Sequence, residues 1–215
     1  MNENLTEIVC VLDRSGSMET IQQDAIGGFN QFLTEQQEQE GDARMTVVLF
    51  NHGYRILHDG ADIQGVEPLS SETYRPGGTT ALLDAVGRTI DDVGERLAET
   101  PEEGRPSKVI FVILTDGMEN ASQEYDYNRV KEMVGHQSDV YNWEFIFLGA
   151  NIDAVAVAGS LNIKASHAVN YSADSLGTSE AFGKVRYAVS TYRHSGAVAA
   201  DWKDADESGT TSYNE

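Results

Sequence analysis

Three short segments of the sequence combine carboxylate and hydroxyl side chains with glycine. They are residues 13–17 (DRSGS), 77–80 (GGTT) and 115–117 (TDG). Their potential ligand atoms are all oxygens, and they belong to Asp13, Ser15, Ser17, Thr79 and Asp116. Oxygen donors suit hard cations with octahedral shells, so this set predicts Mg²⁺, with Mn²⁺ or Ca²⁺ as alternatives, rather than zinc or copper.

The charge of this ligand set indicates what the ion would do. Asp13 and Asp116 together balance one divalent cation, and the hydroxyl groups add no further charge. An ion held in this way stays electrophilic, and a coordination position occupied by water can be taken by a carboxylate from outside. We therefore expect the metal to complete its shell with an Asp or Glu side chain of a partner protein.

Short apolar runs alternate with amphipathic stretches along the chain. Strands are predicted at 8–12, 45–50, 54–57, 109–114, 143–148 and 167–171, and helices at 18–33, 82–97, 126–134, 154–161 and 181–192. This order predicts an α/β fold of three layers, in which a doubly wound, mostly parallel sheet carries helices on both faces. The run at 54–57 is expected as a short antiparallel edge strand. Because ligands bind at the carboxyl edge of such sheets, segments 13–17 and 115–117 should share one rim.

The helix at 82–97 carries two further expectations. Thr79 or Thr80 can cap its amino end. Two i,i+4 ion pairs are predicted on its polar side, Asp84 with Arg88 and Asp92 with Arg96.

Composition limits the class of protein. The chain has 215 residues with 35 Asp and Glu against 15 Lys and Arg, which gives a net charge of −20. This length suits one domain, predicted over residues 1–200, and a polar, disordered tail over 201–215. The strong negative charge argues against nucleic-acid partners and against docking on an anionic membrane.

Redox chemistry and targeting are constrained as well. The single cysteine, Cys10, excludes an internal disulfide and a cysteine-built zinc site, and we expect it to be a small buried apolar residue. The first ten residues lack the pattern of a secretory signal, and the longest apolar run, 109–114, is far too short to span a membrane. A cytoplasmic location is the expectation.

In their order and spacing, the three oxygen-bearing segments resemble the von Willebrand factor A (vWA) domain and its metal-ion-dependent adhesion site (MIDAS). The resemblance covers roughly residues 5–195 and implies that Asp13, Ser15, Ser17, Thr79 and Asp116 bind the ion directly or through water. It implies Thr79 rather than Thr80, because Thr79 directly follows the glycine pair. Segment 147–163 looks like the corresponding region of compact bacterial or phage members.

The sequence also bears on functions other than a binding module. Each segment alone is also typical of an ordinary turn or helix cap. An aspartyl phosphotransfer enzyme would need an acid at position 15, which is serine, and a P-loop would need a lysine that 77–84 lacks. Enzymatic activity is therefore not expected. A scaffold subunit with a structural or empty metal site remains an alternative, and the sequence predicts no oligomeric state.

The remaining acidic residues are expected on helix faces, loops and the tail. At long range they would repel an acidic partner. On this basis we expect the partner to carry basic residues around the carboxylate that it presents.

Overall fold

The central element is a single mixed sheet. The computed structural model describes residues 1–211, and the six strands found there lie in the order β3-β2-β1-β4-β5-β6. The strands are β1 (Asn2–Asp13), β2 (Asp42–Phe50), β3 (Tyr54–Asp62), β4 (Pro106–Thr115), β5 (Glu144–Ala150) and β6 (Ala168–Tyr171).

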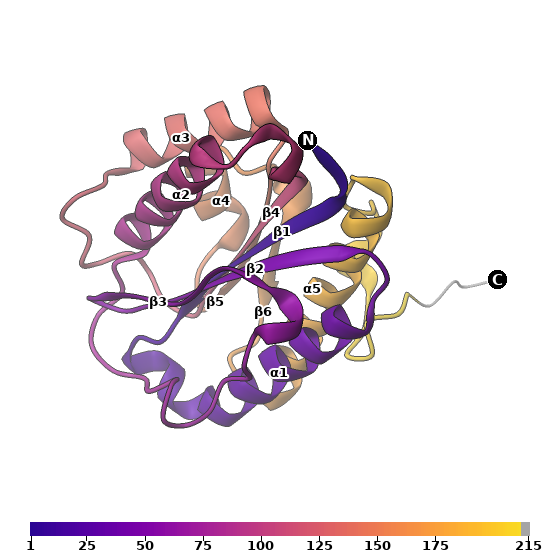
Figure 1. The fold of residues 1–215 in the computed structure, drawn as a ribbon. Coiled ribbons are helices and arrows are strands. Elements are labelled where there is room, and N and C mark those ends of the chain that lie inside the picture. The colour runs from indigo at the N-terminus through magenta and orange to yellow at the C-terminus, as the bar shows by residue number, and fades with distance from the viewer. Residues whose placement is uncertain (212–215) are drawn as a thin grey trace.

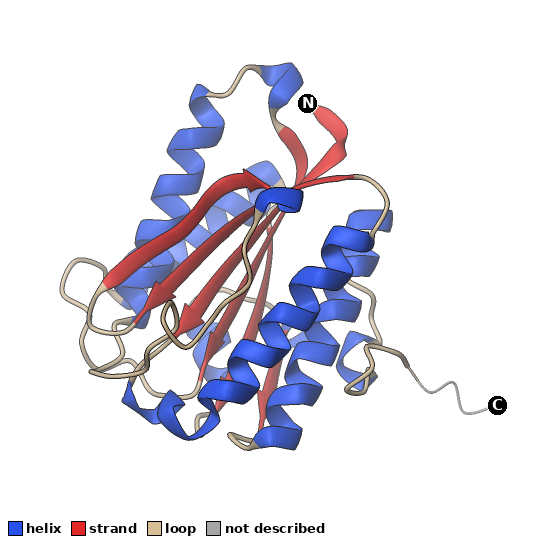
Figure 2. Cartoon of the chain, turned by 60° about the horizontal axis from the view of Figure 1, so that its bottom comes forward, coloured by secondary structure: helices blue, strands red, loops and turns tan. Residues whose placement is uncertain are grey.

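Only the β2–β3 pair is antiparallel; all other neighbours pair in parallel. The parallel strands therefore end at one edge of the sheet, as Figure 2 shows. The predicted mostly parallel sheet and its antiparallel edge strand are confirmed, although β3 extends five residues past the predicted end, to Asp62.

Helices cover both faces of the sheet. They are α1 (Gln22–Glu38), α2 (Leu82–Glu99), α3 (Tyr127–Tyr141), α4 (Ala154–Ser160) and α5 (Ser175–Ser195). Helices α1 and α5 pack on one face, and α2, α3 and α4 on the other (Figure 1). The three-layer α/β fold predicted from the sequence is confirmed.

Strand β1 lies at the centre and separates two cores. Its alternate residues face opposite ways, so Ile8, Cys10 and Leu12 join the core beneath α1 and α5. Val9 and Val11 join the core beneath α2, α3 and α4. A strand buried on both faces needs an unbroken apolar run, which is the pattern that predicted it.

Helix α2 differs from expectation at its amino end. Neither Thr79 nor Thr80 caps it. Instead Glu119 Oε2 accepts a hydrogen bond from the backbone N–H of Leu83 at 2.9 Å, and Ser122 Oγ accepts one from that of Asp84 at 3.0 Å. The loop after β4 therefore caps this helix, which fixes the loop against the helix.

The two ion pairs predicted within α2 are not formed. The Asp84 carboxylate instead accepts hydrogen bonds from three backbone N–H groups of residues 123–125, at 2.8 to 2.9 Å. The Asp92 carboxylate accepts one from the hydroxyl of Tyr54 at 2.9 Å. Unpaired backbone donors compete well for a carboxylate, whereas an exposed i,i+4 pair contributes only a few tenths of a kcal/mol.

Arg96, at the other end of α2, reaches into the sheet. Its guanidinium binds the fully buried carboxylate of Glu7 at 2.9 Å and Asp59 of β3 at 2.8 Å. The hydroxyl of Thr46 donates to Glu7 at 2.8 Å and accepts from Arg96 at 3.0 Å. This network ties α2 to three strands of the sheet.

The segment after α5 differs from the predicted disordered tail. Trp202 is buried, and its indole N–H donates to the carbonyl of Ser166 at 2.8 Å. Ala205 and Thr211 form a β-bridge, and the Arg186 guanidinium donates to the carbonyl of Glu207. One large aromatic residue anchors a stretch that is otherwise polar. Positions 212–215 of the predicted tail lie outside the described residues.

Within residues 1–211, no helix combines the length and the apolar character that crossing a membrane requires.

Candidate metal site

The first predicted segment lies where β1 ends. Asp13 is fully buried, and its Oδ1 accepts a hydrogen bond from the backbone N–H of Ser15 at 2.7 Å. Its Oδ2 accepts one from the hydroxyl of Thr115, at the end of the neighbouring strand β4, at 2.6 Å. The carboxylate is thus held from both sides, by its own turn and by β4.

The second carboxylate comes from the end of β4. The Ser17 hydroxyl donates to Asp116 Oδ1 at 2.5 Å, and Ser15 Oγ lies 3.2 Å from Ser17 Oγ. Four of the five predicted ligands, Asp13, Ser15, Ser17 and Asp116, are therefore brought together at the carboxyl edge between β1 and β4.

The fifth predicted ligand, Thr79, is not among the side chains brought together. Thr79 is exposed, whereas the next residue, Thr80, is buried. A Cβ atom added to Gly117 would lie 3.3 Å from Thr80 Oγ1 and 3.6 Å from Ser17 Oγ. The hydroxyls of Thr80 and Ser17 therefore border the same glycine.

The backbone explains this choice of threonine. Asn120 Oδ1 accepts from the N–H of Thr80 at 2.9 Å, and the N–H of Asn120 donates to the Thr80 carbonyl at 3.0 Å. Gly77 and Gly78 both have positive φ values, 154° and 79°, so the chain turns there before Thr80 is reached. The glycine pair thus shapes the turn, and the residue buried directly after it is Thr80 rather than Thr79.

Both carboxyl groups are electrostatically unfavourable as ions. Burial raises the pKa of Asp13 from 3.8 to about 6, although hydrogen bonds from Thr115 and Ser15 favour its ionised form. Burial also raises the pKa of Asp116, against the hydrogen bond from Ser17. A cation bound by both carboxylates would offset this cost of burying their charges.

One buried oxygen of the site has no partner. Asp116 Oδ2 is buried and makes no hydrogen bond, while Oδ1 of the same group is bound by Ser17. An unsatisfied buried carboxylate oxygen is costly, so it indicates a missing ligand. Within residues 1–211, no three His, Cys, Asp or Glu side chains form a metal cluster, so a cation here would depend on the hydroxyl groups as well.

Three residues that were not predicted as ligands support the site. Thr115 binds Asp13, the hydroxyl of Tyr74 donates to the carbonyl of Asp13, and the amide of Asn51 donates to the Gly77 carbonyl at 2.6 Å. Thr115 could have been recognised from its place directly before Asp116. Tyr74 and Asn51 carry no such signal, because their role depends on how distant loops meet.

The loop after β4 borders the site. Met118 is 70% exposed there. The carboxylate of Glu119 is bound within the chain instead. Its Oε1 accepts from the N–H groups of Ala121 and Ser122 in the loop at 2.8 Å, and its Oε2 accepts from α2. Asn151, at the end of β5, donates to the carbonyl of Asp116 at 3.4 Å. Met118 is the large apolar side chain that this loop presents to solvent.

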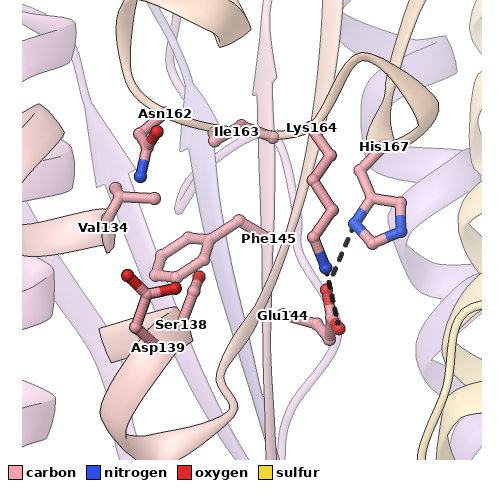
Figure 3. A pocket seen from close by; sticks show the side chains of 9 residues that line it. All are labelled: Val134, Ser138, Asp139, Glu144, Phe145, Asn162, Ile163, Lys164 and His167. Carbon is pink, nitrogen blue, oxygen red and sulfur yellow. Dashed lines mark ion pairs between the residues drawn. The ribbon is translucent and has the colours of Figure 1, made fainter. Parts of the chain in front are cut away.

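A separate pocket lies at the opposite edge of the sheet, where β5 begins. Figure 3 shows Lys164 and His167 pointing toward Glu144, at 3.6 and 3.2 Å. Burial would raise the pKa of Glu144, but these two neighbours lower it overall. Glu144 thus pairs with two basic side chains of this pocket, and the pocket is not part of the candidate metal site.

Solved structures with the same fold include two of proximal thread matrix protein 1 from the mussel byssus. One is 14% identical with a TM-score of 0.60, and the match covers 86% of this chain and 47% of that one. The other, described with a zinc-occupied MIDAS motif, is 15% identical with a TM-score of 0.59, covering 90% and 47%. A mutant PilB minor pilin from Streptococcus sanguinis is 11% identical with a TM-score of 0.60, covering 90% and 63%.

These likenesses define the fold. The chain has the fold of a vWA domain, and the resemblance seen in its sequence is confirmed at that level. The chain spans about half the length of the mussel protein (47%). No family model and no curated protein matches the sequence.

Proposed function

We propose that this protein is a binding module that captures a carboxylate of a partner protein through a divalent cation. The buried Oδ2 of Asp116 carries the proposal, because it lies in a cluster of oxygen donors and makes no hydrogen bond with any residue from 1 to 211. The zinc-occupied MIDAS motif of the structurally similar mussel protein supports a divalent ion in a site of this kind.

The proposed ligand set modifies the sequence prediction at one position. Asp13, Ser15, Ser17 and Asp116 remain, and Thr80 takes the place of Thr79. The burial of Thr80 and its approach to Gly117 support this exchange. The donor set is all oxygen, which favours Mg²⁺, with Mn²⁺ or Ca²⁺ as alternatives.

The chain's own residues would balance the charge of a divalent cation without adding an excess of negative charge, so the bound ion would still attract an anion from outside. Asp13 and Asp116 supply two negative charges, and the hydroxyls supply neutral oxygens. Thr115 and the backbone of Ser15 hold Asp13 in place, so the carboxylate does not have to reorganise when an ion arrives. When bound, the cation supplies Lewis acidity toward an external oxygen anion. An enzyme and a scaffold with a structural ion are the alternative functions, and no feature of the site favours either.

Calorimetric titration of metal-free protein with Mg²⁺ and with Mn²⁺ tests the site. We expect one ion per chain, and Asp116→Asn should weaken binding on the order of a hundredfold, because ligand charge sets the affinity of such sites. The matched control is Glu124→Gln, which removes a carboxylate from the same loop that pairs with Arg88 instead. Equal affinities for wild type and Asp116→Asn would refute the proposed ligand set.

A further inference from the structure

The loops on one side of the candidate metal site carry positive charge, unlike most of this acidic chain. We name residues 14–18, 51–55 and 74–81 the arginine rim. These segments contain no Asp or Glu, in a chain that has 35 of them. Apart from Tyr54 and Tyr74, their charged or titratable side chains are Arg14, His52, Arg55 and Arg75. The surface here is locally positive although the protein has a net charge of −20.

Backbone hydrogen bonds join the three segments into one surface. Arg14 N–H donates to the carbonyl of Phe50 at 2.7 Å, and its carbonyl accepts from the N–H of Gly77 at 2.9 Å. Ala81 N–H donates to the carbonyl of Asn51 at 2.8 Å. The Arg14 guanidinium also donates to the Arg75 carbonyl at 3.3 Å. The arginine rim is therefore continuous with the turn that holds Ser15 and Ser17.

Strand register places Arg55 at the same edge. Arg55 pairs with Leu49 of β2, and Leu49 pairs with Leu12 of β1, which immediately precedes Asp13. Arg55 is thus two strands away from the candidate site, or about 10 Å across the sheet. Arg14 itself lies between the ligands Asp13 and Ser15 in sequence.

Within the described residues, none of the three arginines forms an ion pair with a carboxylate. The Nε atom of Arg14 is buried without a hydrogen-bond partner. Burial, and then the nearby charge of Arg55, lower the pKa of Arg14. The flanking acids in sequence, Glu19 and Glu72, are exposed and do not neutralise the arginine rim through an ion pair.

The loop on the other side of the site contains acidic residues, and these bind groups of the chain itself. The loop 116–126 contains four acidic residues, and three of them are engaged within the chain. Glu119 caps α2, Glu124 pairs with Arg88 at 2.6 Å, and Asp126 accepts from the N–H of Arg129 at 2.8 Å. Glu124 is the acid of this loop that forms an ion pair, and the other two are held by backbone N–H groups. This side of the site therefore carries acids, whereas the arginine rim carries positive charge and no acid.

We infer that the partner binds through a short segment with at least two carboxylates, one for the cation and one or more for the arginine rim. This inference rests on the proposed function and specifies its partner. The net charge of the whole chain favours basic residues around the partner's carboxylate. The groups nearest the site favour acidic ones instead, and close, partly desolvated charges outweigh screened distant ones.

The test compares three labelled synthetic peptides of equal length in Mg²⁺, measured by fluorescence anisotropy. One carries a single Asp between Gly and Ser residues, one carries three consecutive acidic residues, and one carries a phosphoserine. We expect the triacidic peptide to bind about tenfold more tightly than the single-Asp peptide, and chelation of Mg²⁺ to abolish both.

Arg55→Glu and Arg75→Glu should remove this difference while leaving Mg²⁺ titration unchanged. The matched control is Arg44→Glu. In the strand register, Arg44 of β2 lies opposite Glu7 of β1, which is six residues before Asp13. Arg44 is therefore about 20 Å from the site along the strand direction. Arg44→Glu makes the same change of charge and should preserve the tenfold preference.

The outcomes separate the two proposals. Failure of Mg²⁺ to bind would refute the proposed function itself. If Mg²⁺ binds but the triacidic peptide gains nothing over the single-Asp peptide, or Arg44→Glu weakens it as much as Arg55→Glu, the inferred partner is overturned. Tighter binding of the phosphoserine peptide than of the triacidic one would also overturn it, in favour of a phosphorylated partner.

Discussion

Asp13 is a buried acid at the end of a central strand, and its ionisation opposes folding in the absence of a cation. Its pKa in the fold is about 6, against 3.8 for the ordinary group. A raised carboxyl pKa means that the folded state binds the proton more tightly than the unfolded state does. This contribution to stability is present below pH 4 and is lost as the pH rises through 6.

A pH dependence of metal stabilisation follows. Mg²⁺ binds the ionised carboxylate, so protons compete with it below pH 6. We expect the rise in Tm produced by saturating Mg²⁺ to be clearly larger at pH 7.5 than at pH 5.0, measured by differential scanning calorimetry. The same scans without metal serve as the control. An equal rise at both pH values would contradict the assignment of Asp13.

Thr79 and Thr80 provide a matched pair of variants. Thr80→Val keeps the shape of the side chain and removes its hydroxyl, and it should weaken Mg²⁺ binding on the order of tenfold. Thr79→Val should leave the affinity unchanged, since Thr79 is exposed. Isothermal titration of both variants decides which threonine belongs to the site. Weakening by Thr79→Val alone would restore the assignment made from sequence.

The residue types and spacing predicted which side chains gather, with the exception of this threonine. Asp13, Ser15 and Ser17 alternate within one turn, and Asp116 ends the neighbouring strand, so strand order alone brings them together. The choice between two adjacent threonines depends on the turn at Gly77 and Gly78, and on Asn120 from a distant loop. Such contacts carry no periodic signal in a sequence.

Helix α2 is joined to the sheet by a buried ion pair, because Arg96 of the helix neutralises Glu7 of β1. Removing one partner of a buried ion pair leaves the other charge unpaired. Arg96→Leu should therefore destabilise the protein by about 3–5 kcal/mol in urea unfolding. Arg88→Leu, which breaks the more exposed pair with Glu124, should cost about 1 kcal/mol or less. Similar costs for the two variants would show that Glu7 finds another partner.

Element positions were largely predictable, whereas the connections between elements were not. The apolar runs predicted the strands, and the periodic stripe of Leu82 to Leu97 predicted α2. The prediction of ion pairs within α2 was wrong, because the i,i+4 rule treats a helix in isolation from the rest of the fold. In the fold, Asp84 meets the free N–H groups of residues 123–125, and Arg96 meets a buried carboxylate.

At the scale of the whole molecule, the segment after α5 belongs to the folded structure. Trp202→Ala removes a large buried side chain and its hydrogen bond to Ser166, and should cost about 3–5 kcal/mol. Leu176→Ala is the control, since Leu176 is 62% exposed and its loss should change stability by about 0.5 kcal/mol or less. Equal stability of Trp202→Ala and wild type in urea would instead support the tail predicted from composition.

The prediction of a disordered tail from composition differs from the fold for a physical reason. Residues 201–211 are mostly polar, which is typical of a disordered tail, but burial of a single Trp gives such a stretch an anchor. The layers and strand order follow from patterns repeated over the whole chain, so one exceptional residue does not change them. A short terminal segment has no repetition, and one side chain determines its placement.

The candidate ligands lie far apart in the sequence, and folding brings them together. Ser17 and Asp116 are 99 residues apart in the chain and meet only after β4 has docked beside β1. The unfolded chain therefore has no equivalent site, and any cation that binds the native form selectively shifts the folding equilibrium. An ion at a hundred times its Kd would add about 2.7 kcal/mol to the free energy of unfolding. The ion would thus report on refolding, since only chains that have completed the central strand pair can take it up.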